Sequence, residues 1–279
     1  MDDLRLTPAA HLEHLRRESA RFREVLAATD PDAGVPACPA WTAADLLWHL
    51  GPGVQGFWAD VVAHRPAAPD EREAPPRPPS YDAVLAGFDA AHAALLAELE
   101  AVVLHGDPAE EAWSWAEEHT VAFTLRRQAL EALVHRVDAE QTAGLPSVLP
   151  ADLAADGVLE VLDLMYGASP SWGRFTPGDG LARVDLTDTG DTLWVRLGTF
   201  TGTDPDSGRS YADEPDLSVV AGPDAGTPDG DVVLRGTAAE VLCRLWQRSD
   251  HTRVAWEPVT ALGVATQQRL LALLAGPID

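Results

Sequence analysis

The residues with the clearest capacity for chemistry are Glu131 and His135, which lie four positions apart in the segment RRQALEALVHRVDAE. Residues four apart on a helix share a face, with Cβ atoms roughly 5–6 Å apart, so a carboxylate and an imidazole there can bind one metal ion. His49, in the upstream segment WTAADLLWHL, is a third candidate ligand. Three protein ligands leave one tetrahedral position of a zinc ion open, which is typical of catalytic zinc. We therefore predict a metal site at His49, Glu131 and His135.

A simpler interpretation of the Glu131 and His135 pair is a solvated contact, which stabilises a helix by only about 0.2–0.5 kcal/mol. The surroundings of the pair favour a metal site. A projection at about 100° per residue places five polar residues on one stripe beside an apolar surface: Thr124, Arg127, Glu131, His135 and Asp138. Inward-facing carboxylates and histidines commonly form metal sites in helix bundles.

The charge of the chain argues against nucleic acids and anionic membranes as partners. The 279 residues include 44 acidic and 20 basic residues, every basic one an arginine, for a formal net charge of -24. Binding to phosphate backbones requires clustered basic residues, and the longest basic runs are two arginine pairs. We predict no binding to nucleic acid or to membranes.

Cysteine usage and the N-terminal sequence indicate a reducing, cytoplasmic location. Cys38 and Cys243 lie far apart and form neither a disulfide framework nor a CxxC metal motif. Cys38 is expected to be a buried structural thiol, and Cys243 to lie in a helix core. The N-terminus lacks the apolar core of a signal peptide, and no segment is apolar enough for a membrane span.

The first half of the chain has helical periodicity and predicts a four-helix bundle over residues 1–148. Pro8 follows Thr7, a suitable N-cap, and Thr42 can cap the helix that carries His49. Gly51, Pro52 and Gly53 are expected to kink or break that helix just after the ligand. The predicted long helices cover 8–28, the segment from 43 onward, 81–104 and 119–142 with an end at Gly144, and the proline-rich segment 66–80 is an exposed connection.

The second half, residues 149–279, predicts a small α+β domain. A helix over 151–166 precedes short alternating segments, ARVDLTD, TLWVRLG, DLSVVAG and DVVLRG, which indicate an antiparallel sheet with one solvated face. Thr237 and Glu240 form a capping box for the next helix. The strand-like TRVAWE follows, and a last helix is expected over about 258–275. The whole chain is thus expected to combine an α domain with an α+β domain.

The segments VPACPAWTAADLLWHL and TVAFTLRRQALEALVHRVDAE resemble the paired motifs of the mycothiol-dependent maleylpyruvate isomerase family. The resemblance covers most of the chain and implies a DinB-like metal-binding bundle followed by an α+β domain shaped like sterol carrier proteins. It also implies that His49, Glu131 and His135 are the zinc ligands. Leu130 departs from the pattern, because relatives often carry a histidine there, and this bears on the substrate or on the ligands' surroundings.

The resemblance implies a metal-dependent, mycothiol-using enzyme that adds an activated thiolate to an electrophilic small molecule. The outcome is cis–trans isomerisation of the maleylpyruvate type or transfer of the thiol. Arg127 can bind an anionic substrate group or neutralise nearby carboxylates, and Asp138 can orient a ligating imidazole or be a surface acid.

By the same resemblance, the second domain is expected to supply an arginine to the active site, for which the candidates are Arg196, Arg235 and Arg253. Two other classes of function stay open. One is a metal-dependent hydrolase that uses metal-bound water, and the other is a non-catalytic DinB-like binding protein.

Overall fold

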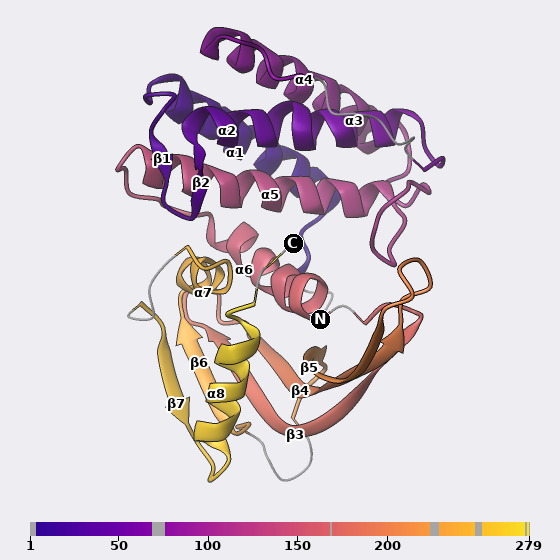
Figure 1. Cartoon of the computed structure of the whole chain (residues 1–279), viewed down its shortest axis with the longest axis vertical. Coiled ribbons are helices and arrows are strands. Elements are labelled where there is room, and N and C mark those ends of the chain that lie inside the picture. Colours follow the sequence, from indigo (N-terminus) through magenta and orange to yellow (C-terminus); the bar gives the residue numbers. More distant parts are fainter. Residues whose placement is uncertain are drawn as a thin grey trace. The chain divides into compact units, whose positions relative to one another are not determined.

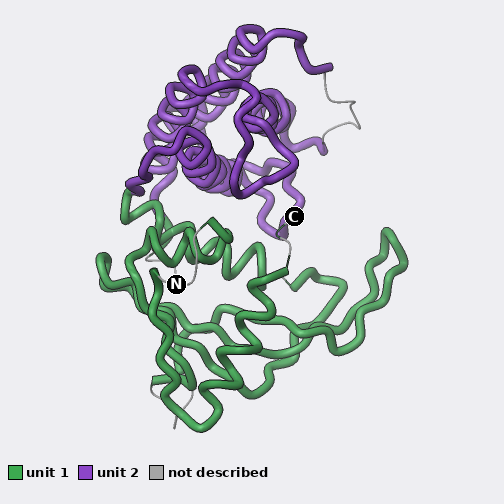
Figure 2. The backbone as a smooth tube through the Cα atoms, turned by 60° about the vertical axis from the view of Figure 1, so that its left-hand side comes forward, with its two compact units in different colours: residues 1–5, 150–279 green, residues 6–149 purple. Residues whose placement is uncertain are grey.

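The chain divides into two compact units, which Figure 2 colours separately. One unit comprises residues 6–149, and the other comprises residues 150–279 together with residues 1–5. The computed structural model describes residues 4–68, 76–167, 169–223, 229–248, 253–276 and 278. Part of the predicted connection over 66–80 lies outside these residues. Helices in the first unit and an antiparallel-rich sheet in the second confirm the predicted combination of an α and an α+β part.

The helical unit consists of long helices packed side by side (Figure 1). The second helix is continuous in three segments, the middle one a π-helix, and a two-stranded β-hairpin precedes it. Its elements are α1 (Pro8–Ala27), β1 (Gly34–Val35), β2 (Cys38–Thr42), α2 (Ala43–Trp48), η2 (His49–Gln55), α3 (Gly56–Ala63), α4 (Tyr81–His105) and α5 (Val121–Thr142).

The helix ends follow from side-chain capping, as the sequence predicts. Thr7 accepts a hydrogen bond from the backbone N–H of Ala10 at the start of α1. Thr42 and Asp45 form a reciprocal capping box at the start of α2. Gly144 has a φ of 69°, a left-handed conformation that glycine adopts without strain, and it ends α5.

α5 is the central helix of this unit, because 18 of its 22 residues are buried. A helix with one solvated face would bury far fewer. α1 packs along α5, and α4 packs along the helix formed by α2, η2 and α3. The polar residues of α5 therefore lie in the interior and need partners there.

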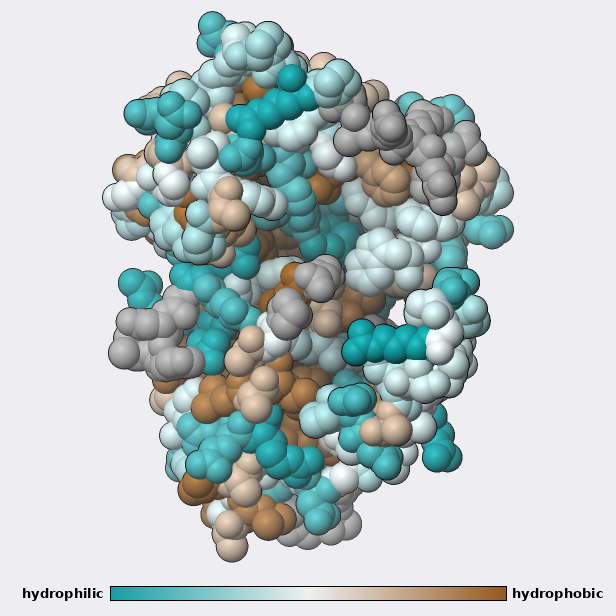
Figure 3. Space-filling model, in the orientation of Figure 1, coloured by the Kyte–Doolittle hydropathy of each residue, from teal (hydrophilic) through white to brown (hydrophobic). Residues whose placement is uncertain are grey.

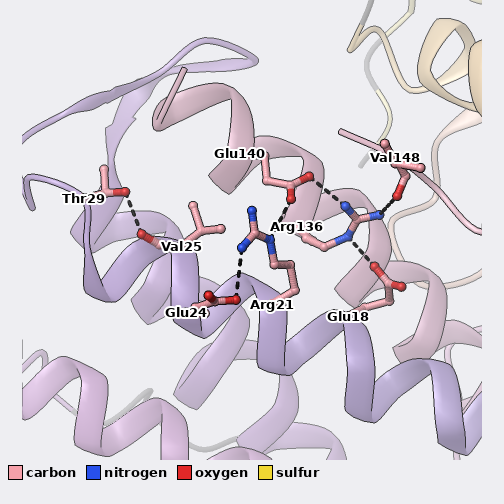
Figure 4. Close-up of polar contacts among 8 residues, drawn as sticks. All are labelled: Glu18, Arg21, Glu24, Val25, Thr29, Arg136, Glu140 and Val148. Atoms are coloured by element: carbon pink, nitrogen blue, oxygen red, sulfur yellow. Dashed lines mark hydrogen bonds and ion pairs between the residues drawn. The ribbon is translucent and has the colours of Figure 1, made fainter. Parts of the chain in front are cut away.

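A buried ionic network joins α1 to α5 (Figure 4). The Arg136 guanidinium donates to Glu18 on α1, to Glu140 at 2.7 Å and to the Val148 carbonyl at 3.2 Å. Arg21 approaches the other oxygen of Glu140 at 2.9 Å. Burial raises the pKa of Glu18, although the nearby Arg136 opposes that shift. The network satisfies two carboxylates that would otherwise be buried without partners.

The second unit has a five-stranded sheet of order β5-β4-β3-β6-β7 with helices packed on it. In Figure 3, hydrophobic side chains gather on this unit where α8 lies. The elements are α6 (Ala151–Glu160), η3 (Val161–Tyr166), β3 (Gly173–Leu186), β4 (Thr192–Thr203), β5 (Ser210–Val220), β6 (Val232–Gly236), α7 (Ala238–Leu245), β7 (Ala255–Pro258) and α8 (Gly263–Leu273). As predicted, Leu193, Val195 and Leu197 face the core, and Thr237 and Glu240 form a capping box.

Three details of this unit differ from the prediction. β6 lies parallel to β3 on the side away from β4, so the sheet is not purely antiparallel. β3 begins at Gly173, before the predicted segment ARVDLTD. A bulge-like irregularity between Pro177 and Leu181 accommodates the turn-forming residues there within the strand. α8 begins at Gly263 and not near 258, because β7 extends to Pro258.

Both cysteines are half-buried, so neither is the fully buried thiol that the sequence suggests. Cys38 packs at the edge of a core cluster of the helical unit. No helix among the described residues is long and apolar enough to cross a membrane.

Candidate metal centre

The side chains of His49, Glu131 and His135 converge within the helical unit. One ligand atom from each lies within 4.8 Å of the other two. Oε1 of Glu131 is 3.1 Å from Nε2 of His135 and 3.7 Å from Nε2 of His49. The two imidazole rings meet edge to face, with centroids 4.9 Å apart. The structure therefore brings together the three residues that the sequence singles out.

The position of His49 depends on an unusual helical segment. Of the kink or break predicted at Gly51–Pro52–Gly53, a break does not occur, since the backbone continues as the π-helix η2, which begins at His49. The wider turn of a π-helix accommodates Pro52 without ending the helix, and such segments are frequent at functional sites. A Cβ atom at Gly51 would lie 2.9 Å from the Cα atom of Phe88, so glycine permits the close approach of α4.

Glu131 divides its two oxygen atoms between two kinds of partner. Oε2 contacts the Arg127 guanidinium, while Oε1 faces the two imidazoles. Burial by itself would raise the pKa of the carboxyl, but Arg127, His135 and His49 hold this pKa well below its usual range. Glu131 is therefore ionised, with one oxygen held in place and the other directed to the centre.

His135 has different partners at its two ring nitrogens. Nδ1 lies 3.0 Å from Oδ2 of Asp138, which is fully buried, and Nε2 faces Glu131. Burial favours the neutral ring, but Asp138 and Glu131 outweigh it and raise the pKa of His135 to about 9. Loss of the Nε2 proton leaves a tautomer in which Nδ1–H donates to Asp138 and Nε2 has a lone pair for a metal.

Trp41 is a neighbour of the centre that sequence reasoning did not find. Its ring centroid lies 4.7 Å from that of His49 and 6.4 Å from that of His135. The sequence signal was the position of Trp41 directly before Thr42, the N-cap of the helix that carries His49. The indole forms an aromatic wall beside both imidazoles.

The donor set fits a divalent metal such as zinc. Ligand atoms 2.0–2.2 Å from a tetrahedral zinc lie roughly 3.3–3.6 Å apart, close to the 3.1 and 3.7 Å observed here. His49 is the most exposed of the three, at 35% of its side-chain surface, so its ring has the greatest freedom to complete the geometry. Two imidazoles and one carboxylate are typical of zinc sites that keep one position open.

The other residues that the sequence singles out differ in whether they contact the candidate ligands. Arg127 and Asp138 contact Glu131 and His135, respectively. Leu130 is buried. Among the arginines of the second unit, Arg235 pairs with Asp185 at 3.1 Å and Glu257 at 3.8 Å.

Arg196 lines a pocket of about 600 Å³ on the sheet of the second unit. It lies on β4, where its partner on β5 is Ser218. The other residues that line the pocket are Phe175, Pro177, Gly178, Asp179, Val220 and Gly222. Arg253 lies just before β7. Arg196 is thus the one of the three candidate arginines that lines this pocket.

Comparison with known proteins identifies the helical unit. Residues 12–140 match the family model described as the mycothiol maleylpyruvate isomerase N-terminal domain. This part of the chain belongs to that family. The resemblance carried by the motifs around His49 and Glu131 is thereby confirmed, and the matched residues include all three members of the centre.

The fold resembles that of solved members of the family beyond the matched domain. The crystal structure of the mycothiol-dependent maleylpyruvate isomerase aligns with a TM-score of 0.50 and 15% identity, over 92% of this chain and 94% of that one. A histidine-to-alanine mutant of that enzyme aligns with the same TM-score and coverage at 14% identity. No curated protein matches the sequence. At this identity, the likeness is one of fold.

Proposed function

We propose that this protein is a mycothiol-dependent metalloenzyme whose reaction is cis–trans isomerisation of maleylpyruvate or a close analogue. The observation that carries the proposal is the convergence of His49, Glu131 and His135 in a domain of the mycothiol maleylpyruvate isomerase family. A zinc ion bound there would lower the pKa of a thiol at its open position, so that the nucleophilic thiolate is present at neutral pH.

The residues of the chain have distinct roles in this proposal. Oε1 of Glu131 and Nε2 of both histidines are the ligand atoms. Arg127 restrains Oε2 of Glu131, which supports its role as a neutralising partner over that of a substrate-binding residue. Asp138 keeps the proton of His135 on Nδ1 and is a positioning residue. Trp41 limits access of water from its side of the centre.

The charge balance suits a bound thiolate. A divalent ion with Glu131, Asp138 and Arg127 has a net charge of about +1 when the histidines are neutral. A thiolate neutralises this charge, whereas a neutral thiol would leave it uncompensated. With a metal bound, this partly buried site would therefore favour the thiolate form of the cofactor over the neutral thiol.

Product analysis separates the proposed isomerase from its alternatives. The purified protein, with its metal content measured by elemental analysis, is incubated with maleylpyruvate with and without mycothiol. We expect the trans isomer only with mycothiol, and the amount of thiol should stay constant. Consumption of the thiol with formation of a conjugate would indicate an S-transferase instead.

The remaining alternatives give different results. Thiol-independent cleavage of esters or amides would identify a hydrolase that uses metal-bound water. A non-catalytic binding protein would show no turnover of any of these substrates. In His49→Ala we expect metal and activity to be lost together, and full activity without metal would contradict the proposal.

A further inference from the structure

Two buried polar side chains on α5 have atoms without a hydrogen-bond partner. Thr124 is fully buried and Gln128 is 1% exposed. Oγ1 of Thr124 and both Oε1 and Nε2 of Gln128 contact no donor or acceptor in the part of the chain that the structure describes. More than about 90% of buried polar groups in proteins are satisfied, and each orphan costs about 1–3 kcal/mol. Three orphaned atoms within one helical turn therefore call for an explanation.

These two residues lie on the same line of α5 as the candidate ligands. Thr124, Gln128, Glu131 and His135 are separated by four, three and four positions, which places them on one helical stripe. At 1.5 Å per residue, Gln128 lies about 4.5 Å and Thr124 about 10 Å from Glu131 along the helix axis. Both distances are within the length of a small organic molecule that has one end at the centre.

The chemistry of the orphaned atoms indicates what such a molecule presents. A carboxamide has donors and acceptor sites, so a carboxylate would satisfy Nε2 of Gln128 but leave Oε1 without a donor. A secondary amide or a hydroxyl satisfies both atoms, because it donates and accepts. The pair thus fits the amide of a cysteine-derived thiol, which lies a few bonds from the sulfur, better than a carboxylate of the substrate.

We propose that Gln128 and Thr124 bind the amide and hydroxyl groups of the thiol cofactor while its sulfur lies at the metal centre. This inference rests on the proposed function and adds the residues that select the cofactor. The competing explanation is that ordered water satisfies these groups in every state of the protein.

The test measures stability and binding separately. Gln128→Leu and Thr124→Val remove the orphaned atoms and nearly preserve shape, so the stability of the ligand-free protein should be unchanged or higher in chemical denaturation. Calorimetric titration of the zinc-loaded protein with mycothiol should show affinity reduced roughly 5- to 20-fold in each variant. Gln141→Leu, on the same helix beyond His135, is the control and should bind like the wild type.

Simpler thiols with and without an amide test whether Gln128 contacts the amide of the cofactor. Ethanethiol has no amide, so Gln128→Leu and the wild type should bind it equally, whereas N-acetylcysteine should distinguish them. Equal affinity of wild type and both variants for mycothiol would overturn the inference and leave the proposed function intact. The inference would also be overturned if Gln128→Leu lost as much affinity for ethanethiol as it loses for mycothiol. If the zinc-loaded wild type bound no thiol, the proposed function would fail first, and this inference with it.

Discussion

At the scale of single residues, the centre is organised by the partners of its ligands. Glu131 can direct one oxygen inward because Arg127 holds the other, and His135 can present Nε2 because Asp138 lies at Nδ1. These two ligands therefore have a fixed direction before a metal binds, whereas the more exposed His49 keeps greater freedom. Such preorganisation reduces the cost of ordering the site upon binding.

Replacing Asp138 by asparagine should weaken metal binding. The substitution keeps the shape of the side chain but removes the charge that favours the Nδ1–H tautomer of His135. Loss of a carboxylate that supports a metal-bound histidine typically costs about 10- to 100-fold in metal affinity. Competition with a chromogenic zinc chelator measures this loss. Asp82→Asn, at an exposed position on α4, is the control, and equal affinities for both variants would show that Asp138 has no such role.

His92 should make the helical unit sensitive to acid. Its ring contacts the Gln55 amide oxygen at 3.0 Å, and burial lowers its pKa to about 4, an effect that Asp89 opposes and Arg16 reinforces. In the unfolded chain, His92 becomes protonated as the pH falls below about 6.5, whereas in the folded chain it stays neutral until about pH 4. Stability should therefore be lost as the pH falls through this window.

Because His92 is only half-buried, we expect the loss to be about 1–2 kcal/mol, below the maximum that the pKa shift allows. His92→Gln removes the titrating group, so its urea unfolding curves should depend less on pH between 6.5 and 4 than those of the wild type. Identical pH profiles for the two proteins would contradict this account.

At the scale of elements, the π-helix η2 is the feature of the metal centre that the sequence did not predict. Gly51, Pro52 and Gly53, which begin two residues after His49, indicate a kink or break by local propensity, but packing of η2 against α4 keeps the segment helical. Tertiary packing thus overrides a local rule. The long helices α1, α4 and α5 were predictable to within about two residues, since their periodicity and caps agree.

Gly51→Ala should disturb both the packing of α4 and the metal site. The new methyl group would lie 2.9 Å from the Phe88 backbone, so η2 must move, and His49 begins that segment. We expect a loss of about 1–3 kcal/mol in the free energy of unfolding and weaker zinc binding. Gly53→Ala is a matched control, because its Cβ would meet only the Trp48 carbonyl at an ordinary 3.5 Å. Equal stability of the two variants would refute this role of Gly51.

The contact between α1 and α5 should depend strongly on Arg136. Arg136→Met leaves Glu18 and Glu140 buried without their main partner. Removing one member of a buried ion pair costs about 3–5 kcal/mol. Arg17→Met breaks only an exposed pair with Glu13 and should change stability by no more than about 0.5 kcal/mol. Denaturant unfolding compares the two, and a loss below about 1 kcal/mol for Arg136→Met would be inconsistent with this network.

At the scale of the whole molecule, the alternation of apolar residues predicted the strands of an antiparallel sheet but gave no prediction of their order. Leu193, Val195 and Leu197 mark a buried strand face in the sequence. The parallel pairing of β6 with β3 depends on contacts between distant segments, which no local pattern encodes. The pair Glu131 and His135 was informative because its ligand types and four-residue spacing are local, whereas Trp41 becomes a neighbour of His135 only after folding.

The formal net charge of -24 makes the chain as a whole strongly acidic, in contrast to the local positive charge proposed at the metal centre. Such an acidic chain disfavours anionic polymers as partners, and the proposed reaction requires only small molecules. Under the proposed function, the positive charge that a thiolate needs would be supplied locally, by the bound metal and by Arg127 beside it. This arrangement is compatible with the acidic composition of the rest of the molecule.

The indole of Trp41 next to both imidazoles gives the protein an optical reporter of its own. A paramagnetic ion such as Cu²⁺ at this centre would quench the fluorescence of the nearest indole most strongly, and Trp41 lies within 6.4 Å of both rings. The difference between the emission of wild type and Trp41→Phe would isolate that signal from the other tryptophans. Occupancy could then be followed in real time, in a stopped-flow instrument, without a dye or a label.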